Sequence, residues 1–257
     1  MSGIANVLVA LVAVQAMLAL TFGAVAALLL WRFWPSLPAA SLVDGEKIPE
    51  RLHRELLHLQ QTGDRIKDVS INANDSWVVL YGLSRYTWQD VPPGLQFALD
   101  SFARSGAEIK QVALGPHNEW LILLNYNGYW QDRMPPALTQ RLDTCYARGR
   151  EITQVAIGSG YEWMALHDRN GYDTERLPTA AFEAIVNFNR QNKEIRRVAW
   201  GGEPATWVVL GDREAVFSDN ASPQLQASVR DALAQKQTIR SIRILPDSGW
   251  LIVKDGK

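Results

Sequence analysis

Five tryptophans recur at nearly constant spacing through most of the chain, and this repeat limits the possible fold more than any other feature. Trp77, Trp120, Trp163, Trp207 and Trp250 are separated by 43, 43, 44 and 43 residues. Each tryptophan follows an isoleucine by 11 or 12 residues, and these isoleucines are Ile66, Ile109, Ile152, Ile195 and Ile239. A fixed period of this length is typical of architectures in which every unit buries its apolar face against its neighbours. The sequence therefore predicts one domain over residues 39–257, built of five units that start near these isoleucines.

Each unit has the pattern of three strands followed by one helix. The segment opened by isoleucine has apolar residues on one face, such as Val69 and Ile71. Its other face carries small residues that allow a close neighbour: Ser70, Ala113, Ala156 and Ala199. The segment opened by tryptophan is apolar without alternation, which is typical of a strand covered on both faces. Asn-Gly pairs at 127–128 and 170–171 then predict a hairpin into a short third strand.

A proline-initiated helix is predicted to follow the third strand. Four prolines at equivalent places are suited to a first helical turn, namely Pro92, Pro135, Pro178 and Pro223. Leu95, Leu99 and Phe102 form an apolar stripe at helical spacing, and Gly106 and Gly149 stand where such helices end. The segment 48–52 matches 134–138, so a helix of the same type is expected before the first complete unit.

The two ends of the repeated region complement each other. The fifth unit stops at Asp255, Gly256 and Lys257, before its third strand. Third strands elsewhere have an aromatic residue six positions before the helix-initiating proline, and the same count from Pro49 leads to Val43. We therefore expect residues 41–47 to supply the missing strand. A chain completed in this way needs no end caps, which an open array of repeats requires, so the sequence predicts a closed ring of five units.

A ring of five units with three strands and one helix each resembles the five-fold α/β propeller of the pentein superfamily. The resemblance covers residues 41–257 and concerns architecture alone. Catalytic penteins modify guanidino groups with a cysteine nucleophile and histidine and acidic partners, whereas Cys145 lies in the helix predicted over 135–148 with no histidine at a matching place. The resemblance therefore implies non-catalytic binding of a macromolecule. The alternative fold is a conventional β-propeller, which has a similar period but would need a fourth strand where the helical stripe lies.

The N-terminal segment differs in composition from the repeated region. Residues 1–43 contain no acidic residue and one basic residue, Arg32, and residues 7–31 are uncharged. A helix of 25 residues spans roughly 37 Å, more than the ~30 Å hydrocarbon core of a bilayer. Trp31, Phe33 and Trp34 surround Arg32 as at a membrane interface, and Pro35 follows. The sequence thus predicts a transmembrane anchor and linker over residues 1–38.

Two aspects of this anchor have alternatives. A cleaved signal peptide would have a basic start and a shorter apolar run, and neither is present here. The basic residues nearest to the span follow it, and by the positive-inside rule they favour a single-pass membrane protein with the folded domain in the cytoplasm. Because only Arg32 is adjacent to the span, an extracytoplasmic domain is the competing orientation.

Several functional classes are disfavoured by the composition and by the motifs. The chain has 26 basic and 27 acidic residues, so it lacks the basic excess of a nucleic-acid binder, and its single cysteine excludes an internal disulfide. No P-loop, dinucleotide fingerprint or paired zinc cysteines occur. Glu50 and His53, like Glu55 and His58, have di-iron spacing, but no other predicted helix carries this motif. Cys145 is interpreted as a packing residue. We therefore expect no cofactor, no metal and no enzymatic activity.

Two groups of residues are candidates for partner binding. The loops between the first and second strands each contain an acid: Asp75, Glu119, Glu162, Glu203 and Asp247. On one rim of a ring these acids could attract a cation or a basic segment. Trp88 and Trp130 occur in two units only, which is typical of a partner surface rather than of a repeated core position. We expect a membrane-anchored scaffold that docks a protein or peptide through rim loops. The alternative is a ring enzyme that acts on a small cationic or guanidino substrate; the oligomeric state is not predicted.

Overall fold

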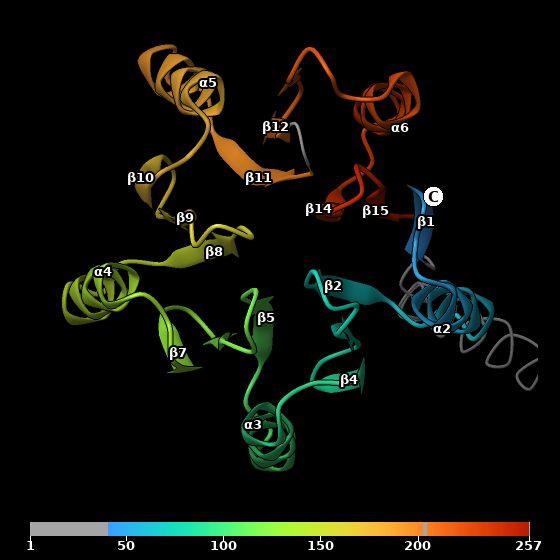
Figure 1. Ribbon diagram of the computed structural model, residues 1–257, viewed down its shortest axis with the longest axis vertical. Helices are drawn as coiled ribbons and strands as arrows, with labels where there is room; N and C mark the ends of the chain where they lie inside the picture. Colours follow the sequence, from blue (N-terminus) through green and yellow to red (C-terminus); the bar gives the residue numbers. More distant parts are fainter. Residues whose placement is uncertain (1–40, 203–204, 257) are drawn as a thin grey trace, which may run out of the picture. The chain divides into compact units, whose positions relative to one another are not determined.

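The computed structural model describes residues 41–202 and 205–256, which belong to the second of two compact units, divided after residue 38. These residues form five three-stranded antiparallel sheets, each associated with helices in an α/β arrangement (Figure 1). The first strands are β2 (Ile66–Ile71), β5 (Ile109–Leu114), β8 (Ile152–Ile157), β11 (Ile195–Gly201) and β14 (Ile239–Ile244). The second strands are β3 (Trp77–Tyr81), β6 (Trp120–Leu124), β9 (Trp163–His167), β12 (Thr206–Gly211) and β15 (Trp250–Asp255).

The third strand of each sheet lies at its edge. Four of these strands follow their second strands in the chain: β4 (Arg85–Gln89), β7 (Gly128–Asp132), β10 (Gly171–Glu175) and β13 (Ala215–Phe217). The fifth is β1 (Ser41–Glu46), which pairs antiparallel with β15. Val43 lies opposite Val253, three residues after Trp250, just as Tyr86 lies opposite Leu80, three residues after Trp77. The upstream segment therefore completes the sheet of the fifth unit in the register that the sequence predicts.

Five helices accompany the sheets and begin within one residue of the predicted positions. They are α2 (Glu50–Gln61), α3 (Pro93–Ser105), α4 (Pro136–Ala147), α5 (Thr179–Arg190) and α6 (Pro223–Ala234). Gly106 ends α3 with a left-handed φ of 72°, a conformation that glycine adopts without strain. Each helix buries one stripe, such as Leu95, Ala98 and Leu99 in α3. This stripe packs against the next sheet along the chain, for example against Trp120 and Ile122 of β6.

Every first strand contains a bulge just after its opening isoleucine. The register shifts between residues one and three of β2, β5, β8, β11 and β14. The extra residue is Lys67, Lys110, Thr153, Arg196 or Arg240. In two units this residue connects neighbouring sheets, because Lys67 Nζ donates to Ile109 O at 2.9 Å and Lys110 Nζ donates to Ile152 O at 3.0 Å. Because of the bulge, the side chain of the extra residue leaves the regular strand alternation. In these two units it points towards the adjacent unit.

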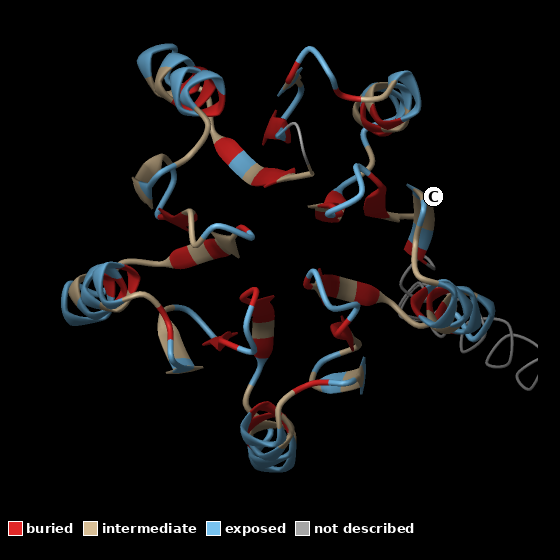
Figure 2. Cartoon of the chain, viewed as in Figure 1, coloured by how far each residue is buried: buried red, intermediate tan, exposed pale blue. Residues whose placement is uncertain are grey.

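The first strands contact one another in sequence order, and β14 also contacts β2. Within residues 41–256 these strands lie innermost and the helices lie at the periphery (Figure 1). Figure 2 shows the same arrangement as burial, with buried residues on the sheets and on the inward sides of the helices. The five repeated tryptophans are 2–7% exposed, which confirms that they fill equivalent core positions.

The localisation predicted from the sequence needs correction. In the part of the chain that the structure describes, no helix is long and apolar enough to cross a membrane. The physical reason is length and patterning, since helices of 12 or 13 residues span only about 20 Å and one face of each is polar. The anchor predicted over residues 1–38 lies outside the described residues.

Side-chain amides connect two pairs of first strands like an additional rung of sheet. Gln111 Nε2 donates to Val155 O at 3.0 Å, and Val155 N donates to Gln111 Oε1 at 2.8 Å. Gln154 makes the same two bonds to Val198, at 2.8 and 2.9 Å. Both glutamines are buried. Each amide therefore pairs with the backbone N–H and C=O of one residue in the next unit, at a buried place where water cannot replace it.

Replacing Gln154 with leucine should lower the free energy of unfolding by about 2–5 kcal/mol. The substitution leaves the buried N–H and C=O of Val198 without partners, and each such loss costs about 1–3 kcal/mol. Urea denaturation measures the effect. Gln226→Leu is the control, because Gln226 lies on helix α6 and its amide bonds only within its own unit, to the carbonyl of Ala221 and to Arg230 Nη2. Equal stability of the two variants would show that the amide rung contributes nothing.

Candidate functional site

The turns between first and second strands share one geometry. Four of them close with a hydrogen bond from the residue five positions before the tryptophan to the residue just before it: Asn72 N to Ser76 O, Gly115 N to Glu119 O, Gly158 N to Glu162 O, and Leu245 N to Gly249 O. Each then has a left-handed residue two positions before the tryptophan: Asp75, Asn118, Tyr161 or Ser248. The corresponding turn of the fourth unit contains residues 203–204, which lie outside the described residues.

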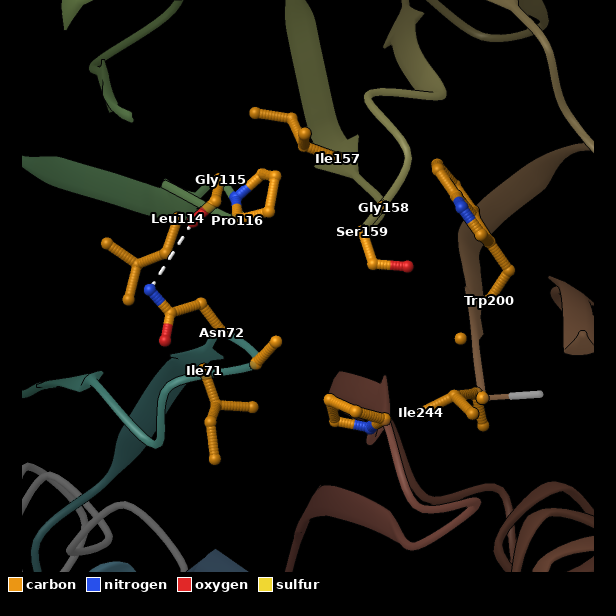
Figure 3. A pocket seen from close by; sticks show the side chains of 14 residues that line it. Ile71, Asn72, Leu114, Gly115, Pro116, Ile157, Gly158, Ser159, Trp200 and Ile244 are labelled. Atoms are coloured by element: carbon orange, nitrogen blue, oxygen red, sulfur yellow. Dashed lines mark hydrogen bonds between the residues drawn. The ribbon is translucent and has the colours of Figure 1, made fainter. Parts of the chain in front are cut away.

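These turns converge on a small pocket of about 60 Å³. Its lining comes from all five sheets and includes the last residue of four first strands, namely Ile71, Leu114, Ile157 and Ile244. Trp200 occupies the equivalent position in the fourth unit. In Figure 3 the hydroxyl of Ser159 extends from its loop into the space between Asn72 and Trp200. The repeat thus builds one pocket from five copies of one structural element.

Two polar side chains of this pocket differ in whether their hydrogen-bonding groups have partners. Asn72 Oδ1 accepts hydrogen bonds from the backbone of Asn74 and Ser76, and Asn72 Nδ2 donates to Gly115 O of the next unit at 3.3 Å (Figure 3). Trp200 is 8% exposed, and its Nε1, like the core nitrogens Trp77 Nε1 and Trp120 Nε1, has no hydrogen-bond partner among the described residues. A buried donor without a partner costs about 1–3 kcal/mol, so an acceptor at this place would be stabilised.

A second cavity of about 60 Å³ lies on the inner side of the same ring of residues. The predicted small face lines it through Ser70, Ala113, Ala156 and Ala199. The fifth unit has Arg243 at this position. Its guanidinium donates to both carboxylate oxygens of Asp68, at 2.9 and 3.0 Å, and Ser241 Oγ donates to Asp68 Oδ1 at 2.8 Å. The fifth and first units are therefore joined by a buried ion pair, whereas the positions of Arg243 and Asp68 hold small, amide or, at Arg197, cationic side chains in the other units.

The predicted rim acids take different roles. Glu119 and Glu162 directly precede their tryptophans, Asp75 stands two positions before Trp77, and Asp247 stands three before Trp250. Asp75 and Asp247 are exposed, Glu162 is half-buried and Glu119 is buried. Glu203 lies outside the described residues. The four described acids thus occupy three different turn positions rather than one equivalent position per unit.

Glu119 is held by the turn and by the neighbouring unit. Its carboxylate accepts hydrogen bonds from His117 N and from Tyr161 Oη, both at 2.8 Å. It lies against Gly115, where an added Cβ would be 2.7 Å from Oε2. Burial raises the pKa of Glu119, but the backbone and Tyr161 hydrogen bonds outweigh burial and hold the pKa below its usual value. This acid therefore joins two loops instead of presenting a free charge.

Glu119→Gln should lower the free energy of unfolding at neutral pH by about 1–2 kcal/mol, because the charged acceptor is replaced by a neutral one. A folded-state pKa below the usual 4.5 means that the contribution is present above pH 4.5 and lost as the pH falls through the folded pKa. Urea denaturation of both proteins at neutral and at acid pH measures the difference. Asp75→Asn, at an exposed turn position, is the control and should match the unsubstituted chain. A difference that is constant with pH would contradict the assigned charge effect.

Basic side chains lie beside the same turns. Arg133 Nη2 donates to Asn118 O at 3.2 Å, Arg176 Nη2 donates to Tyr161 O at 3.3 Å, and Lys47 Nζ donates to Asp247 O at 2.8 Å. Lys47, Arg133 and Arg176 all have positive φ and follow a third strand. The rim therefore carries charges of both signs.

Trp88 and Trp130 lie on the third strands β4 and β7. They are 40% and 58% exposed and lie opposite Val78 and Ile122. Both occupy edge strands of separate sheets, away from the residues that line the pocket.

Sequence reasoning missed the pocket residue Trp200 and the polar residues in the third position of the first strands. Comparing equivalent positions across the five units would have found both groups. Trp200 stands where the other units have isoleucine or leucine, and Asp68, Arg197 and Ser241 stand where two units have glutamine. The sequence matches no protein-family model and no curated protein, and the structure matches no solved structure.

Proposed function

We propose that the five units form a closed, pentein-like α/β propeller that acts as a non-catalytic binding module. The contact between β14 and β2 and the pairing of β1 with β15 support the closed arrangement. Ring closure gives the five turns a common face. On this face the module docks a protein or peptide segment.

The pocket at the turns supports this proposal most strongly. Sites for drug-sized ligands are commonly about 300–1,000 Å³, whereas this pocket has about 60 Å³. That volume suits one small group of a larger partner. The unpartnered Nε1 of Trp200 favours an acceptor, such as a peptide carbonyl or a side-chain amide oxygen. The surrounding turns, with Asp75 and Asp247 exposed, supply the wider contact surface.

No specific observation favours the enzymatic alternative. Among the described residues that line the pocket there is no cysteine, histidine or charged side chain. A guanidino or other cationic substrate needs a carboxylate partner, and an acyl or amidino transfer needs a nucleophile. The lining instead offers apolar side chains, backbone groups, Asn72, Ser159 and Trp200.

Blocking the pocket tests the docking proposal. A photocrosslinking residue at Asp75, beside the pocket, should capture a defined partner in cells of the source organism. Ser159→Tyr fills the pocket entrance from an exposed turn position, and we expect at least a tenfold loss of capture. Ser101→Tyr is the matched control, since Ser101 is exposed on helix α3. Equal capture by both tyrosine variants would refute docking at the turns.

The role of the indole N–H is tested separately. Trp200→Ile gives the fourth unit the side chain that three other units have, so the fold should tolerate it. Loss of the donor should weaken partner binding by about tenfold, which corresponds to the ~1.4 kcal/mol of one hydrogen bond. Charge reversal at Asp247, in the protein that carries the crosslinking residue at position 75, measures the contribution of the other exposed acid. Unchanged partner binding by Trp200→Ile would show that the partner provides no hydrogen-bond acceptor to Trp200. The proposal of docking at the turns would then stand without that hydrogen bond.

A further inference from the structure

A second site of potential chemical importance lies away from the turns, between helix α4 and the third sheet. Cys145 of α4, His167 of β9 and Asp173 of β10 each place one ligand atom within 4.8 Å of the other two. Asp173 Oδ2 lies 3.3 Å from His167 Nε2. Cys145 is 2% exposed and His167 is 6% exposed. The site is therefore an enclosed group of sulfur, nitrogen and oxygen donors.

Cys145 and His167 both depart from the repeat, and the acid at the position of Asp173 recurs in one other sheet. The position of Cys145 holds apolar residues in the other units: Leu59, Phe102, Phe188 and Ala232. The position of His167 holds Tyr81, Leu124, Gly211 and Lys254. The position of Asp173 in the sheet register holds Asp44, Thr87, Trp130 and Val216. Among the described residues, only the junction of α4 with the third sheet brings a cysteine, a histidine and an acid to one point. A simple packing role would not require this simultaneous departure.

The surroundings orient the imidazole ring. His167 lies opposite Gly171 in the sheet, and a Cβ on Gly171 would be 2.0 Å from the ring, so only glycine leaves room for it. His167 Nδ1 lies 3.4 Å from Asp168 Oδ2, on the far side of the ring from Asp173. Asp168 Oδ1 in turn accepts a hydrogen bond from Glu151 N at 3.1 Å. A histidine whose second nitrogen faces a carboxylate is the usual arrangement around metal ligands.

We propose that Cys145, His167 and Asp173 bind one zinc ion. Zinc accepts thiolate, imidazole and carboxylate ligands in tetrahedral geometry. Three protein ligands leave one position to water, reached past Asp173, whose side chain is 27% exposed. On binding, the Cys145 thiol loses its proton to solvent. This ion fixes the end of α4 to β9 and β10. The site departs from the expectation, drawn from the sequence, that the protein holds no metal.

The same geometry disfavours a nucleophilic cysteine. Burial raises the pKa of Cys145, and Asp173 acts in the same direction. A thiol of this kind is protonated in the metal-free protein and has no route to a bulky substrate. Arg141 Nε lies 3.5 Å from Asp173 Oδ1, which leaves Oδ2 for the metal.

Zinc titration of the full-length chain tests the proposal. After treatment with a chelator, the protein is dialysed against zinc sulfate and its metal content is measured by mass spectrometry. We expect one zinc per chain and, with cobalt in place of zinc, a thiolate-to-cobalt charge-transfer band. Substoichiometric zinc or a cobalt spectrum without that band would overturn the proposal.

Substitutions taken from the other units keep the fold intact. Cys145→Ala and His167→Leu introduce the residues of Ala232 and Leu124, and Leu124 also lies opposite a glycine, Gly128. Either variant should lose the bound zinc, and Cys145→Ala should lose the charge-transfer band. Asp168→Asn keeps the bond to Glu151 N and should weaken zinc binding by about 10–100-fold. His58→Gln, on the exposed face of α2, is the control and should retain one zinc. Zinc retained by Cys145→Ala and lost by His58→Gln would assign the metal elsewhere.

Discussion

Deleting strand β1 should unfold the repeated domain or bring it close to unfolding. This strand supplies six paired residues to β15, and without it β15 becomes an exposed edge of a two-stranded sheet. The deletion also removes the bond from Trp250 Nε1 to Glu46 at 2.9 Å and the bond from Ile66 N to Ser41 Oγ at 2.8 Å. We expect a loss comparable with the whole stability of a domain, which is about 5–15 kcal/mol.

The control for this deletion is a chain that begins at residue 39, since it retains every contact of β1. Thermal unfolding followed by circular dichroism compares both truncated proteins with the full chain. The chain that begins at residue 39 should have the stability of the parent domain, whereas the chain that begins at residue 47 should show no cooperative transition. Equal transition temperatures of the two truncated proteins would show that β1 is dispensable, and would count against the closed arrangement of the units.

Much of the fold could be predicted because the repeat samples the same structural solution five times. The tryptophan spacing, the Asn-Gly hairpins and the prolines together predict the three strands and the helix, and the count from Pro49 predicts Val43 opposite β15. These signals are local, and in each unit they agree with the packing of the whole. A single short apolar segment could be either a strand or part of a buried helix, and the agreement of five units removes this ambiguity.

The features that escaped prediction depend on contacts between units. A buried Gln154 resembles an exposed strand residue in the sequence, because its partner is a peptide group 44 positions away. The bulges change which face the following residue occupies, so the simple alternation fails at the start of each first strand. The acids of the turns were grouped by composition, but Glu119 is enclosed by its own loop and by Tyr161 while Asp75 remains exposed. Position within the turn, rather than residue type, determines this outcome.

The candidate binding pocket is built from repeated residues with one exception. Four first strands end in an aliphatic residue around the pocket, and these residues form a common apolar part of its wall. Trp200 breaks the pattern and contributes a hydrogen-bond donor at one point of the wall. The group of Cys145, His167 and Asp173 and the buried ion pair are likewise exceptions at single places in the repeat. In a symmetric scaffold, such exceptions mark the places where one unit has a task that its copies do not share.

The buried ion pair between Arg243 and Asp68 offers the sharpest test of an exception that stabilises the fold. The side chains are 14% and 8% exposed, so the carboxylate and the guanidinium depend on each other for solvation. Asp68→Gln should lower the free energy of unfolding by about 3–5 kcal/mol, because it leaves the charge of Arg243 buried without its partner. Arg243→Ala should have a similar effect, since the buried carboxylate of Asp68 then retains the Ser241 hydroxyl, the backbone of Val69 and the charge of Arg197, but no cation bonded to it.

The double variant shows whether Asp68 and Arg243 stabilise the fold through their mutual interaction or independently. Asp68→Gln with Arg243→Ala gives these two positions the glutamine and the alanine that Gln154 and Ala113 provide where the second and third units meet, so neither member of the pair is left charged without its partner. Its loss of stability should be smaller than the sum of the single losses by about 2 kcal/mol or more, a coupling expected for directly bonded residues. Urea denaturation of the four proteins gives the coupling energy. Strict additivity would mean that the two side chains stabilise the fold independently, and the unit junction would then owe its strength to the surrounding packing.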